Sequence, residues 1–476
     1  MLLLLVVLPA LLAAIGFAIP SSRARPWLLP VAGLLHLGLT CAALALEWPA
    51  VLGGWVALDA LGKLFLLFAS TLYCLLCVYA PGYLAQRAER PNRIFVACLL
   101  LYPSWMSLMI LSQHLGLMWV ALEATTLTTA PMLYFNRTAR SLEAVWKYLL
   151  IGSVGIALAL LGSLFLAYAE LHENLRASLL LVDLVQIAPS LSRPWLHAAF
   201  VLLFIGYGTK MGLAPMHTWK PDAYGEAPGL VGALLAGAST SCAFLAILRL
   251  FHVCVAANDA AFARELMVAF GLFSMAVAAV FMARQHDYKR LLAYSSVEHM
   301  GILVLGIGLG GNATYGALLH LVNNGITKGA LFLSAANIHR AYGSKSIEQT
   351  TGALRVVPFS ASLFLLGFIA ITGSPPFGPF ISEFTILDAA IGGGRTWVAA
   401  LFLGLLVIIF AGMSATVLTV VQGPAPAQLA GPARRETFLT IAPAAVFLVL
   451  SLLLGVYLPP PLERLVHDAA RLGVGP

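Results

Sequence analysis

Apolar runs of roughly 20 residues recur along this chain, and each is long enough to cross a lipid bilayer as a helix. Hydrophobic residues make up 61% of the 476 residues and charged residues 10%, whereas soluble domains carry about a quarter charged residues. A soluble fold could not bury this much apolar surface, so the sequence predicts an all-α polytopic membrane protein with about 14 transmembrane helices. The expected spans are residues 2–19, 27–46, 58–80, 94–112, 115–135, 143–168, 196–216, 229–251, 264–283, 290–310, 314–336, 356–374, 396–421 and 438–458.

Positively charged residues occur mainly in alternate loops between the expected spans. The positive-inside rule assigns these loops to the cytoplasm, so both termini are expected on the periplasmic side of a bacterial cytoplasmic (inner) membrane. The net charge of +7 is spread over these loops and does not indicate a nucleic-acid partner. Residues 1–19 lack a basic start and a clear cleavage site, so they are expected to remain as the first span. The basic loop residues are Arg23, Arg25, Arg87, Arg90, Arg93, Arg137, Arg140, Lys220, Arg284, Lys289, Arg290, Arg340, Lys345, Arg355, Arg434 and Arg435.

Two of the expected spans are interrupted by proline. The stretches Phe204–Gly229 and Ile371–Leu387 each begin as an apolar helix, reach closely spaced prolines and then continue. An interrupted helix at membrane depth is tolerated only where protein or trapped water satisfies the freed backbone groups, and pairs of such helices mark inverted-repeat transporters. The predicted helix breaks are Pro215, Pro221, Pro375 and Pro376.

The positions of the two breaks predict two inverted repeats of five helices each. Spans four to eight contain one break and spans nine to thirteen contain the other. Each break falls at the same position in the order of its five spans. The predicted organisation is therefore 1–93 for N-terminal flanking helices, 94–252 for the first repeat, 253–421 for the second repeat, and 422–476 for a C-terminal flanking helix and tail.

Glu123 and Lys210 are ionisable residues at predicted membrane depth in the first repeat. An unpaired charge there costs several kcal/mol, so such residues are kept either as a structural pair or because they carry protons. The two interpretations overlap, because a pair that breaks and reforms can do both. We predict that Glu123 is a switchable proton carrier whose partner is Lys210.

The second repeat contains a corresponding group of His299, His320, Lys328 and Glu383. His320 and Lys328 are eight residues apart, which places them on roughly one face of a helix. Histidine titrates near neutral pH and relays protons, although a single histidine on an apolar helix is often a core residue with satisfied hydrogen bonds. A relay is favoured here because Lys328 and Glu383 belong to the same repeat.

Other charged residues are expected to be structural. Glu143 and Lys147 are four residues apart and are predicted to form an interfacial pair on a helix. Arg249 lies near the end of a span and is predicted to be an interfacial anchor. Most of residues 169–195 is expected to form an amphipathic surface helix.

The sequence offers no motif for a cofactor. It contains no nucleotide-binding loop, cysteine-rich cluster site or haem motif. Cys74 and Cys77 form C-x-x-C within an apolar helix, but no second Cys/His pair accompanies them. We expect no cofactor and no metal in this chain, so that any redox chemistry takes place in another chain.

Several stretches resemble the antiporter-like membrane subunits shared by respiratory complex I, the Mrp cation/proton antiporters and the energy-converting hydrogenases. The resemblance covers roughly Trp105 to Leu387. KMGLAPMHTWKPDAYGEAP is similar to the family segment in which a lysine-bearing helix leads into a W-L-P-D-A-H-x-x-A-P turn, and DYKRLLAYSSVEHMG is similar to the segment that opens the tenth helix. WVALEATTLTTAPMLYF, SLEAVWKYLLIGSVGIALALLG and TKGALFLSAANI most resemble the F-type subunit of hydrogenase-4 and formate hydrogenlyase-2 complexes.

The resemblance implies a fourteen-helix fold with two inverted five-helix repeats and a proton route through the membrane. It implies that Glu123 and Lys210 form the input-side pair and that Lys328 is the central lysine of the second repeat. It further implies that Glu383 is the carboxylate on the broken helix, and it places His299 on the central axis. The chain departs from the family pattern at Lys220, Tyr224, Gly225, Ser241 and Asn324, where related chains often have leucine, histidine, serine, lysine and histidine, respectively.

The resemblance also predicts the function and the partners. We expect a proton-translocating subunit of a redox-driven complex of the hydrogenase-4 or formate hydrogenlyase type. Its expected partners are other antiporter-like and membrane-anchor subunits, peripheral redox subunits and the lipid bilayer. One alternative is a subunit of NADH-quinone oxidoreductase or of an Mrp-type antiporter, and another is a structural membrane anchor that has lost transport.

Overall fold

The computed structural model describes residues 1–173, 175, 177–429 and 436–471. In this part of the chain the regular elements are helices, and no strand forms apart from isolated bridges such as Val51–Val56. The prediction of an all-α protein is therefore confirmed. Arg434 and Arg435 of the loop charge pattern lie outside the described residues.

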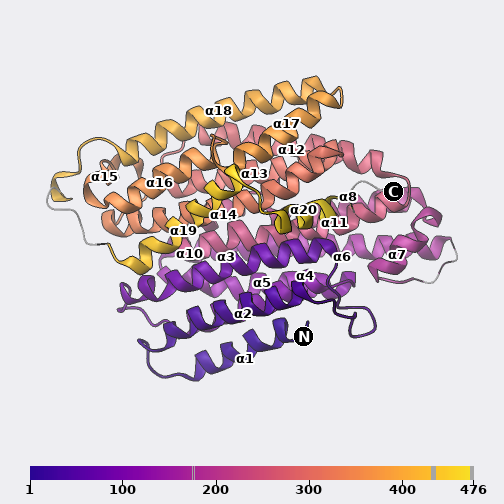
Figure 1. The fold of residues 1–476 in the computed structure, drawn as a ribbon, viewed down its shortest axis with the longest axis horizontal. Helices are drawn as coiled ribbons and strands as arrows, with labels where there is room; N and C mark the ends of the chain where they lie inside the picture. Colours follow the sequence, from indigo (N-terminus) through magenta and orange to yellow (C-terminus); the bar gives the residue numbers. More distant parts are fainter. Residues whose placement is uncertain (174, 176, 430–435, 472–476) are drawn as a thin grey trace.

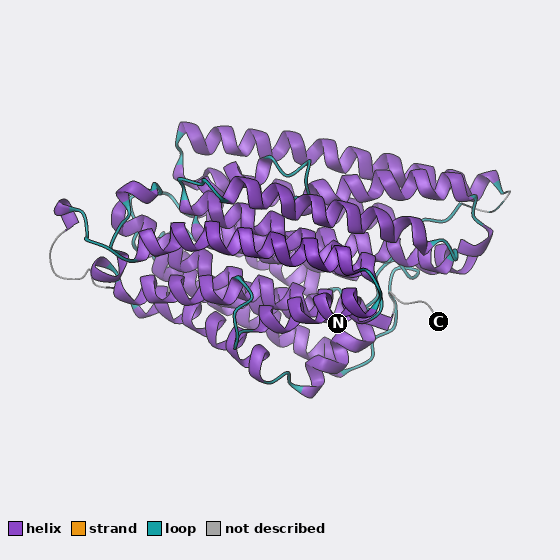
Figure 2. Ribbon diagram, turned by 90° about the horizontal axis from the view of Figure 1, so that it is seen from above, coloured by secondary structure: helices purple, strands orange, loops and turns teal. Residues whose placement is uncertain are grey.

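The helices run side by side along the long axis of the molecule (Figure 1), and Figure 2 shows the same bundle turned by 90°. The N-terminal helices are α1 (Leu4–Ala18), α2 (Leu28–Ala45) and α3 (Ala60–Ala85). They are followed by α4 (Arg93–Leu111), α5 (Leu115–Leu133), α6 (Ala139–His172), α7 (Leu181–Ile187), α8 (Arg193–Met211), α9 (Trp219–Glu226) and a continuous run of α10 (Gly229–Leu234), the π-helical turn η4 (Leu235–Ser239) and α11 (Thr240–Ala256). The remaining helices are α12 (Ala260–Met282), α13 (Tyr288–Leu309), α14 (Asn312–Tyr342), α15 (Ala353–Val356), α16 (Pro358–Ile371), α17 (Gly378–Gly392), α18 (Thr396–Val421), α19 (Phe438–Val456) and α20 (Pro460–Arg471).

Every expected span contains a helix, but the helices differ in how apolar they are. Nine helices of the described part are long and apolar enough to cross a membrane. Helices α5, α8 and α14 are not among these nine, although they contain 19, 19 and 31 residues. These three helices are long enough to span a membrane, but their polar composition keeps them out of the nine. They carry Glu123, Lys210, His320 and Lys328. The count of 14 spans remains a prediction.

The first helix break lies between α8 and α9. Helix α8 ends at Met211 because Gly212 has a φ of +83°, a left-handed conformation that glycine adopts readily. Pro215 lies in the connection that follows, and α9 begins at Trp219. Pro221 lies in the first turn of α9, where a missing backbone N–H is tolerated. Pro215 therefore lies within the break, whereas Pro221 lies after it, inside α9.

The second break lies between α16 and α17. Helix α16 ends at Ile371, and Gly373 in the connection has a φ of +65°. Pro375 and Pro376 follow, and α17 begins at Gly378. From α4 to α11, five helices remain when the short α7 is left out and when α8 with α9, and α10 with α11, each count as one. From α12 to α18, five remain when the short α15 is left out and α16 with α17 counts as one. In both sets the interrupted helix is the fourth.

The centre of the bundle is formed by the run from α10 to α11 and by α13. The apolar windows of these helices are 100% and 94% buried, whereas that of α18 at the edge is only 28% buried. Helix α14 packs against α13, α16, α17 and α19. Figure 1 shows α18 along one edge of the bundle and α1 along the opposite edge. Polar residues on α13 and α14 are therefore shielded from lipid by other helices.

The region 169–195 differs from its prediction as a surface helix. Helix α6 continues to His172, and only the seven-residue α7 follows. Leu181 and Leu184 of α7 are buried, so this helix packs against the bundle. At its other end, α6 begins before the expected span because Thr138 and Ser141 form a capping box there.

Candidate functional site

The first polar cluster consists of Glu123 on α5, Tyr148 on α6 and Lys210 on α8. The Lys210 Nζ lies 3.5 Å from the Tyr148 hydroxyl and 4.9 Å from the centre of the Tyr148 ring. The Tyr148 hydroxyl lies 2.8 Å from Thr129 Oγ1, and the Thr126 hydroxyl donates to Glu123 Oε2 at 3.2 Å. Hydroxyl groups of α5 and α6 therefore occupy the space between the acid and the base.

Glu123 and Lys210, both within the described part of the chain, do not form a direct ion pair. The two charges still interact electrostatically. Lys210 is buried, with 3% of its surface exposed, whereas Glu123 is only half-buried. The predicted partners thus belong to one cluster, but the Tyr148 hydroxyl, rather than the Glu123 carboxylate, is the group hydrogen-bonded to the lysine.

The second polar cluster consists of Glu298 and His299 on α13, His320 and Lys328 on α14, and Ser382 and Glu383 on α17. His299 Nδ1 lies 3.0 Å from His320 Nε2, and His320 Nδ1 lies 2.9 Å from Ser382 Oγ. The Ser382 hydroxyl also reaches the Pro379 carbonyl at 2.9 Å. A continuous hydrogen-bonded chain therefore links α13 to the helix that restarts after the second break.

This chain of hydrogen bonds has a direction. When the single Ser382 hydrogen is donated to the Pro379 carbonyl, His320 Nδ1–H donates to Ser382 Oγ. His320 Nε2 is then an acceptor for His299 Nδ1–H. The remaining nitrogen, His299 Nε2, is buried, has no hydrogen-bond partner among the described residues and lies 4.0 Å from Glu298 Oε2. In the neutral pair, His299 Nε2 is thus the atom that accepts a proton.

Lys328 and Glu298 complete the second cluster. The Lys328 Nζ donates to the Leu292 carbonyl on α13 at 3.2 Å, and Lys328 and Glu298 interact electrostatically. Lys328 and His299 are fully buried, and Glu298 is 3% exposed. Because Leu292 and His299 both lie on α13, Lys328 and His320 face the same helix, as their eight-residue offset predicts. Glu298 is a residue that the sequence did not single out, although it directly precedes His299.

His299, His320 and Glu383 have the donor set of a metal site. One ligand atom from each lies within 4.8 Å of the others, and all three residues are buried. Glu383 Oε1 has no hydrogen-bond partner in the described part of the chain. Two imidazoles and a carboxylate are ligands that zinc accepts, although zinc requires shorter ligand distances and a fourth donor. The same atoms bind protons, and the expectation of a metal-free chain remains a prediction.

The positions that depart from the family pattern are buried as well. Lys220 and Tyr224 are fully buried, and Asn324 and Ser241 are 2% and 4% exposed. The Ser241 hydroxyl donates to the Gly237 carbonyl of its own helix beside the π-helical turn. Lys220 therefore provides a second buried lysine at the first break. The sequence had placed it among the basic loop residues on the cytoplasmic side.

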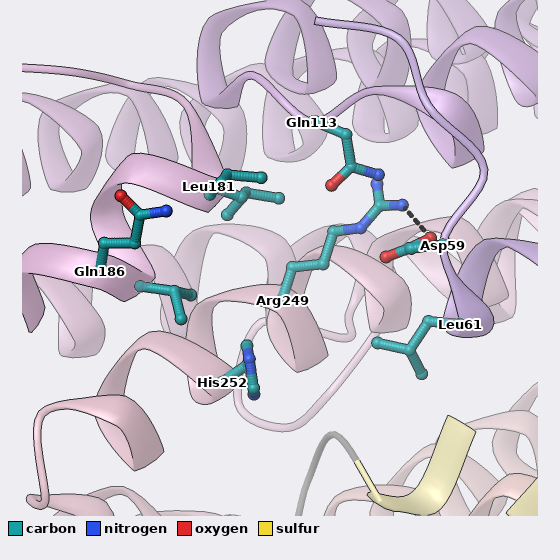
Figure 3. Close-up of a pocket in the computed structure, with 9 residues that line it drawn as sticks. Asp59, Leu61, Gln113, Leu181, Gln186, Arg249 and His252 are labelled. Atoms are coloured by element: carbon teal, nitrogen blue, oxygen red, sulfur yellow. Dashed lines mark hydrogen bonds and ion pairs between the residues drawn. The ribbon is translucent and has the colours of Figure 1, made fainter. Parts of the chain in front are cut away.

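Arg249 lies in a cavity of about 320 Å³ formed by α3, α7, α11 and the α4–α5 connection (Figure 3). It is 3% exposed, and its guanidinium donates to Asp59 at 2.9 Å, to the Ser112 carbonyl at 2.6 Å and to the Ile110 carbonyl at 2.7 Å. The prediction of an interfacial anchor is therefore wrong. Arg249 instead fastens the end of α4 and the start of α3 to α11.

A larger charged cavity of about 750 Å³ lies at the end of the bundle that carries the basic loops. Among its lining residues, Asp222 pairs with Lys147 at 2.8 Å and with Arg290. Lys147 also pairs with Glu143 at 2.6 Å, which confirms the predicted pair. The Lys147, Glu143 and Arg290 side chains are 43%, 63% and 47% exposed, so these charges lie at the surface of the chain, unlike the buried lysines of the two polar clusters.

The sequence of the chain is similar to those of known membrane proteins. Residues 112–409 match the family described as NADH:quinone oxidoreductase/Mrp antiporter, TM. A hydrogenase-4 component F homolog of Methylacidiphilum infernorum is 36% identical over 366 residues, which is 74% of this chain and 76% of the relative. NADH-quinone oxidoreductase subunit N of Desulforudis audaxviator is 29% identical over 392 residues, which is 82% of this chain and 74% of the relative.

The fold also matches a solved structure over its full length. A chain of the membrane-bound sulfane sulfur reductase, described as an archaeal respiratory membrane complex, superposes with a TM-score of 0.89. The superposition covers 100% of this chain and 98% of the other, at 22% sequence identity. At this identity the similarity establishes the arrangement of the helices and not the chemistry.

Proposed function

The chain belongs to the NADH:quinone oxidoreductase/Mrp antiporter membrane family, and we propose that it is the proton-translocating subunit of a redox-driven complex of the hydrogenase-4 type. One observation carries this proposal. Two clusters of acids and bases with largely buried side chains lie on separate groups of helices, one on α5, α6 and α8 and the other on α13, α14 and α17. Both adjoin an interrupted helix.

The energetic cost of these residues supports a role in transport. Lys210 and Lys328 are 3% and 0% exposed, and neither forms an ion pair with a described carboxylate. A charge in such surroundings costs several kcal/mol, and even a buried ion pair can often be replaced by well-packed apolar residues without loss of stability. The lysines are therefore poor structural elements, but their amines suit reversible protonation.

The geometry suggests an order of events. Protonation of the half-buried Glu123 removes its attraction for the Lys210 ammonium. Lys210 then passes its proton toward the second cluster, where His299 Nε2 and Lys328 are the acceptors. Glu383, which lies beside both histidines, governs release. Each transfer changes the charge next to the following group, so the steps are coupled electrostatically.

The similarity to a hydrogenase-4 component F homolog supports this type of complex. We infer that the electrons are transferred in peripheral redox subunits, that no cofactor is held in this chain, and that other membrane subunits flank it. From the positive-inside rule we further infer that the basic loops face the cytoplasm and both termini face the periplasm of a bacterial cell. The subunit then converts redox energy received from its neighbours into proton movement.

The test is proton pumping by the intact complex with Glu123→Gln and Lys210→Met. The complex is purified through a tag on this chain and reconstituted into liposomes that contain a pH-sensitive dye. The electron donor is chosen among H2, formate and NADH according to the redox subunits that co-purify. Each variant is expected to lower the number of protons pumped per electron by at least about 100-fold, as for the loss of a proton-transfer group.

Matched controls are Glu47→Gln and Lys63→Met, because Glu47 is exposed in a loop and Lys63 lies near the start of α3. They are expected to pump like the wild type. Normal pumping by Glu123→Gln and Lys210→Met would reject the proposal and leave a membrane anchor that has lost transport.

A second candidate is a subunit of NADH-quinone oxidoreductase, which the similarity to subunit N favours. The co-purifying chains distinguish the candidates. A nickel–iron hydrogenase subunit supports the hydrogenase-type complex, whereas NADH- and quinone-binding subunits support the second candidate. A set of small antiporter subunits without a redox chain would point to an Mrp-type antiporter instead.

A further inference from the structure

Lys220 is a fully buried lysine that the route above does not use. Its Nζ donates to the Met211 carbonyl at 2.7 Å and to the Ser296 carbonyl at 3.4 Å. No described carboxylate forms an ion pair with it. Lys220 thus resembles Lys210 and Lys328, because all three amines are buried and hydrogen-bonded to uncharged oxygen atoms.

The two carbonyl groups that bind Lys220 belong to the two halves of the proposed route. Met211 directly follows Lys210 and ends α8. Ser296 lies on α13, three residues before His299, so it is about one helical turn away. Lys220 also interacts electrostatically with Lys328 on α14 and with His299 on α13. Its amine therefore joins the end of α8, directly after Lys210, to α13 of the second polar cluster.

The first helix break is shaped around this side chain. A Cβ atom on Gly212 would come within 2.8 Å of the Lys220 Nζ, so any other residue there would require the lysine side chain to shift. Gly212 is also the residue whose φ of +83° ends α8. The Tyr224 ring centre lies 5.8 Å from the Lys220 Nζ, within the range at which an aromatic face attracts a cation. The break thus forms a fitted site for a lysine amine.

We propose that Lys220 carries protons between the first and the second polar cluster. This inference rests on the proposed function. A neutral amine has two N–H groups, and these donate hydrogen bonds to the Met211 and Ser296 carbonyls. The lone pair of the nitrogen remains free. The lone pair takes the proton released by the Lys210 ammonium, which becomes a neutral amine. The Lys220 ammonium then gives this proton to His299 Nε2 or Lys328 and returns to its neutral form. The flexible four-carbon stem allows the amine to approach each cluster in turn.

The test compares Lys220→Gln, Lys220→His and the wild type in the reconstituted complex. Glutamine keeps two N–H donors for the carbonyls but has no titratable group. Lys220→Gln is expected to assemble normally and to pump at least about tenfold fewer protons per electron. Lys220→His restores a titratable group and is expected to regain part of the pumping, with a pH profile shifted to lower pH because histidine has the lower ordinary pKa.

Assembly is measured first, by the recovery of partner chains with the tagged subunit, and Lys63→Gln is the matched control. Normal pumping by Lys220→Gln would overturn the inference, because it would reduce Lys220 to a hydrogen-bond donor. Partial pumping by Lys220→His with an unchanged pH profile would overturn it as well. If Lys220→Gln fails to assemble, the pH profile of an assembled Lys220→His complex decides. If the wild-type complex does not pump, the proposed function fails. If Glu123→Gln and Lys210→Met are defective but Lys220→Gln pumps normally, only the inference about Lys220 is rejected.

Discussion

The first and second polar clusters contain similar residue types in different surroundings. In the first, one half-buried acid and one buried lysine are separated by the hydroxyls of α5 and α6. In the second, two acids, two imidazoles and a lysine are buried, and a directional hydrogen-bonded chain joins three helices. The first cluster therefore depends on electrostatic attraction across a gap, whereas the second depends on fixed hydrogen-bond geometry.

This difference assigns distinct tasks to the two clusters. Glu123 lies partly at the surface of this chain, on the face of α5 that carries the exposed Val120 and Leu127, so it is open to a neighbouring subunit of the complex. The groups of the second cluster are buried inside the chain. We expect the first cluster to respond to its neighbours in the complex and the second to impose the direction of transfer.

The largest effect is expected for Lys328→Met, which removes the base of the second cluster. Lys328 is fully buried, so methionine fills its space with little loss of packing. Pumping should fall at least about 100-fold, to the level of Lys210→Met, because each cluster is needed in series. The protons pumped per electron provide the measurement. Pumping that survives in Lys328→Met but not in Lys210→Met would show that the clusters act independently.

A smaller effect is expected for Ser382→Ala, which removes the hydroxyl that orients His320. A lost hydrogen bond of about 1.4 kcal/mol corresponds to about a tenfold decrease in pumping. Ser382→Thr keeps the hydroxyl and should recover most of the activity, and the pH profile should change only in the alanine variant. Ser414→Ala on α18, where the hydroxyl bonds the Phe410 carbonyl of its own helix, is the control. An unchanged pH profile in Ser382→Ala would contradict the directional chain.

The smallest effect is expected for Tyr148→Phe in the first cluster. The hydroxyl is 3.5 Å from the Lys210 Nζ, which is a long hydrogen bond, and the ring remains to face the ammonium. Pumping should fall about threefold, because less than 1 kcal/mol is lost. Tyr457→Phe, at a residue that is 61% exposed, is the control. A loss as large as that of Lys210→Met would mean that the first cluster also works through fixed hydrogen bonds.

The sequence predicts the fold well because lipid imposes a simple rule on helix length and apolarity. The span expected at 229–251 corresponds to a run of helices from Gly229 to Ala256, and the family prediction is confirmed by the match over residues 112–409. The errors have local causes. Helix α6 extends beyond its apolar run because a capping box starts it, and the surface helix expected in 169–195 is largely absent from the described residues.

The site is predicted less completely, because a periodic pattern reveals the faces of one helix and not what those faces meet. The offset of His320 and Lys328 correctly places both toward one neighbour. By contrast, Tyr148 lies on α6 and gives no sign in the sequence that it contacts Lys210. The sequence likewise does not reveal the roles of Glu298, Lys220 and Arg249, because these arise from interactions with distant segments of the chain.

The polar composition of α5, α8 and α14 also bears on how the protein is made. These helices lack the apolarity of the nine helices in the described part of the chain that are long and apolar enough to span a membrane. When a ribosome delivers them to the membrane, they gain little from entering lipid alone and depend on helices already present or still to come. Integration of the nascent chain is therefore a collective event. A chain truncated soon after α5 contains only the packing partner α4 and should leave α5 poorly inserted, whereas a chain extended through α6, its second packing partner, should retain it.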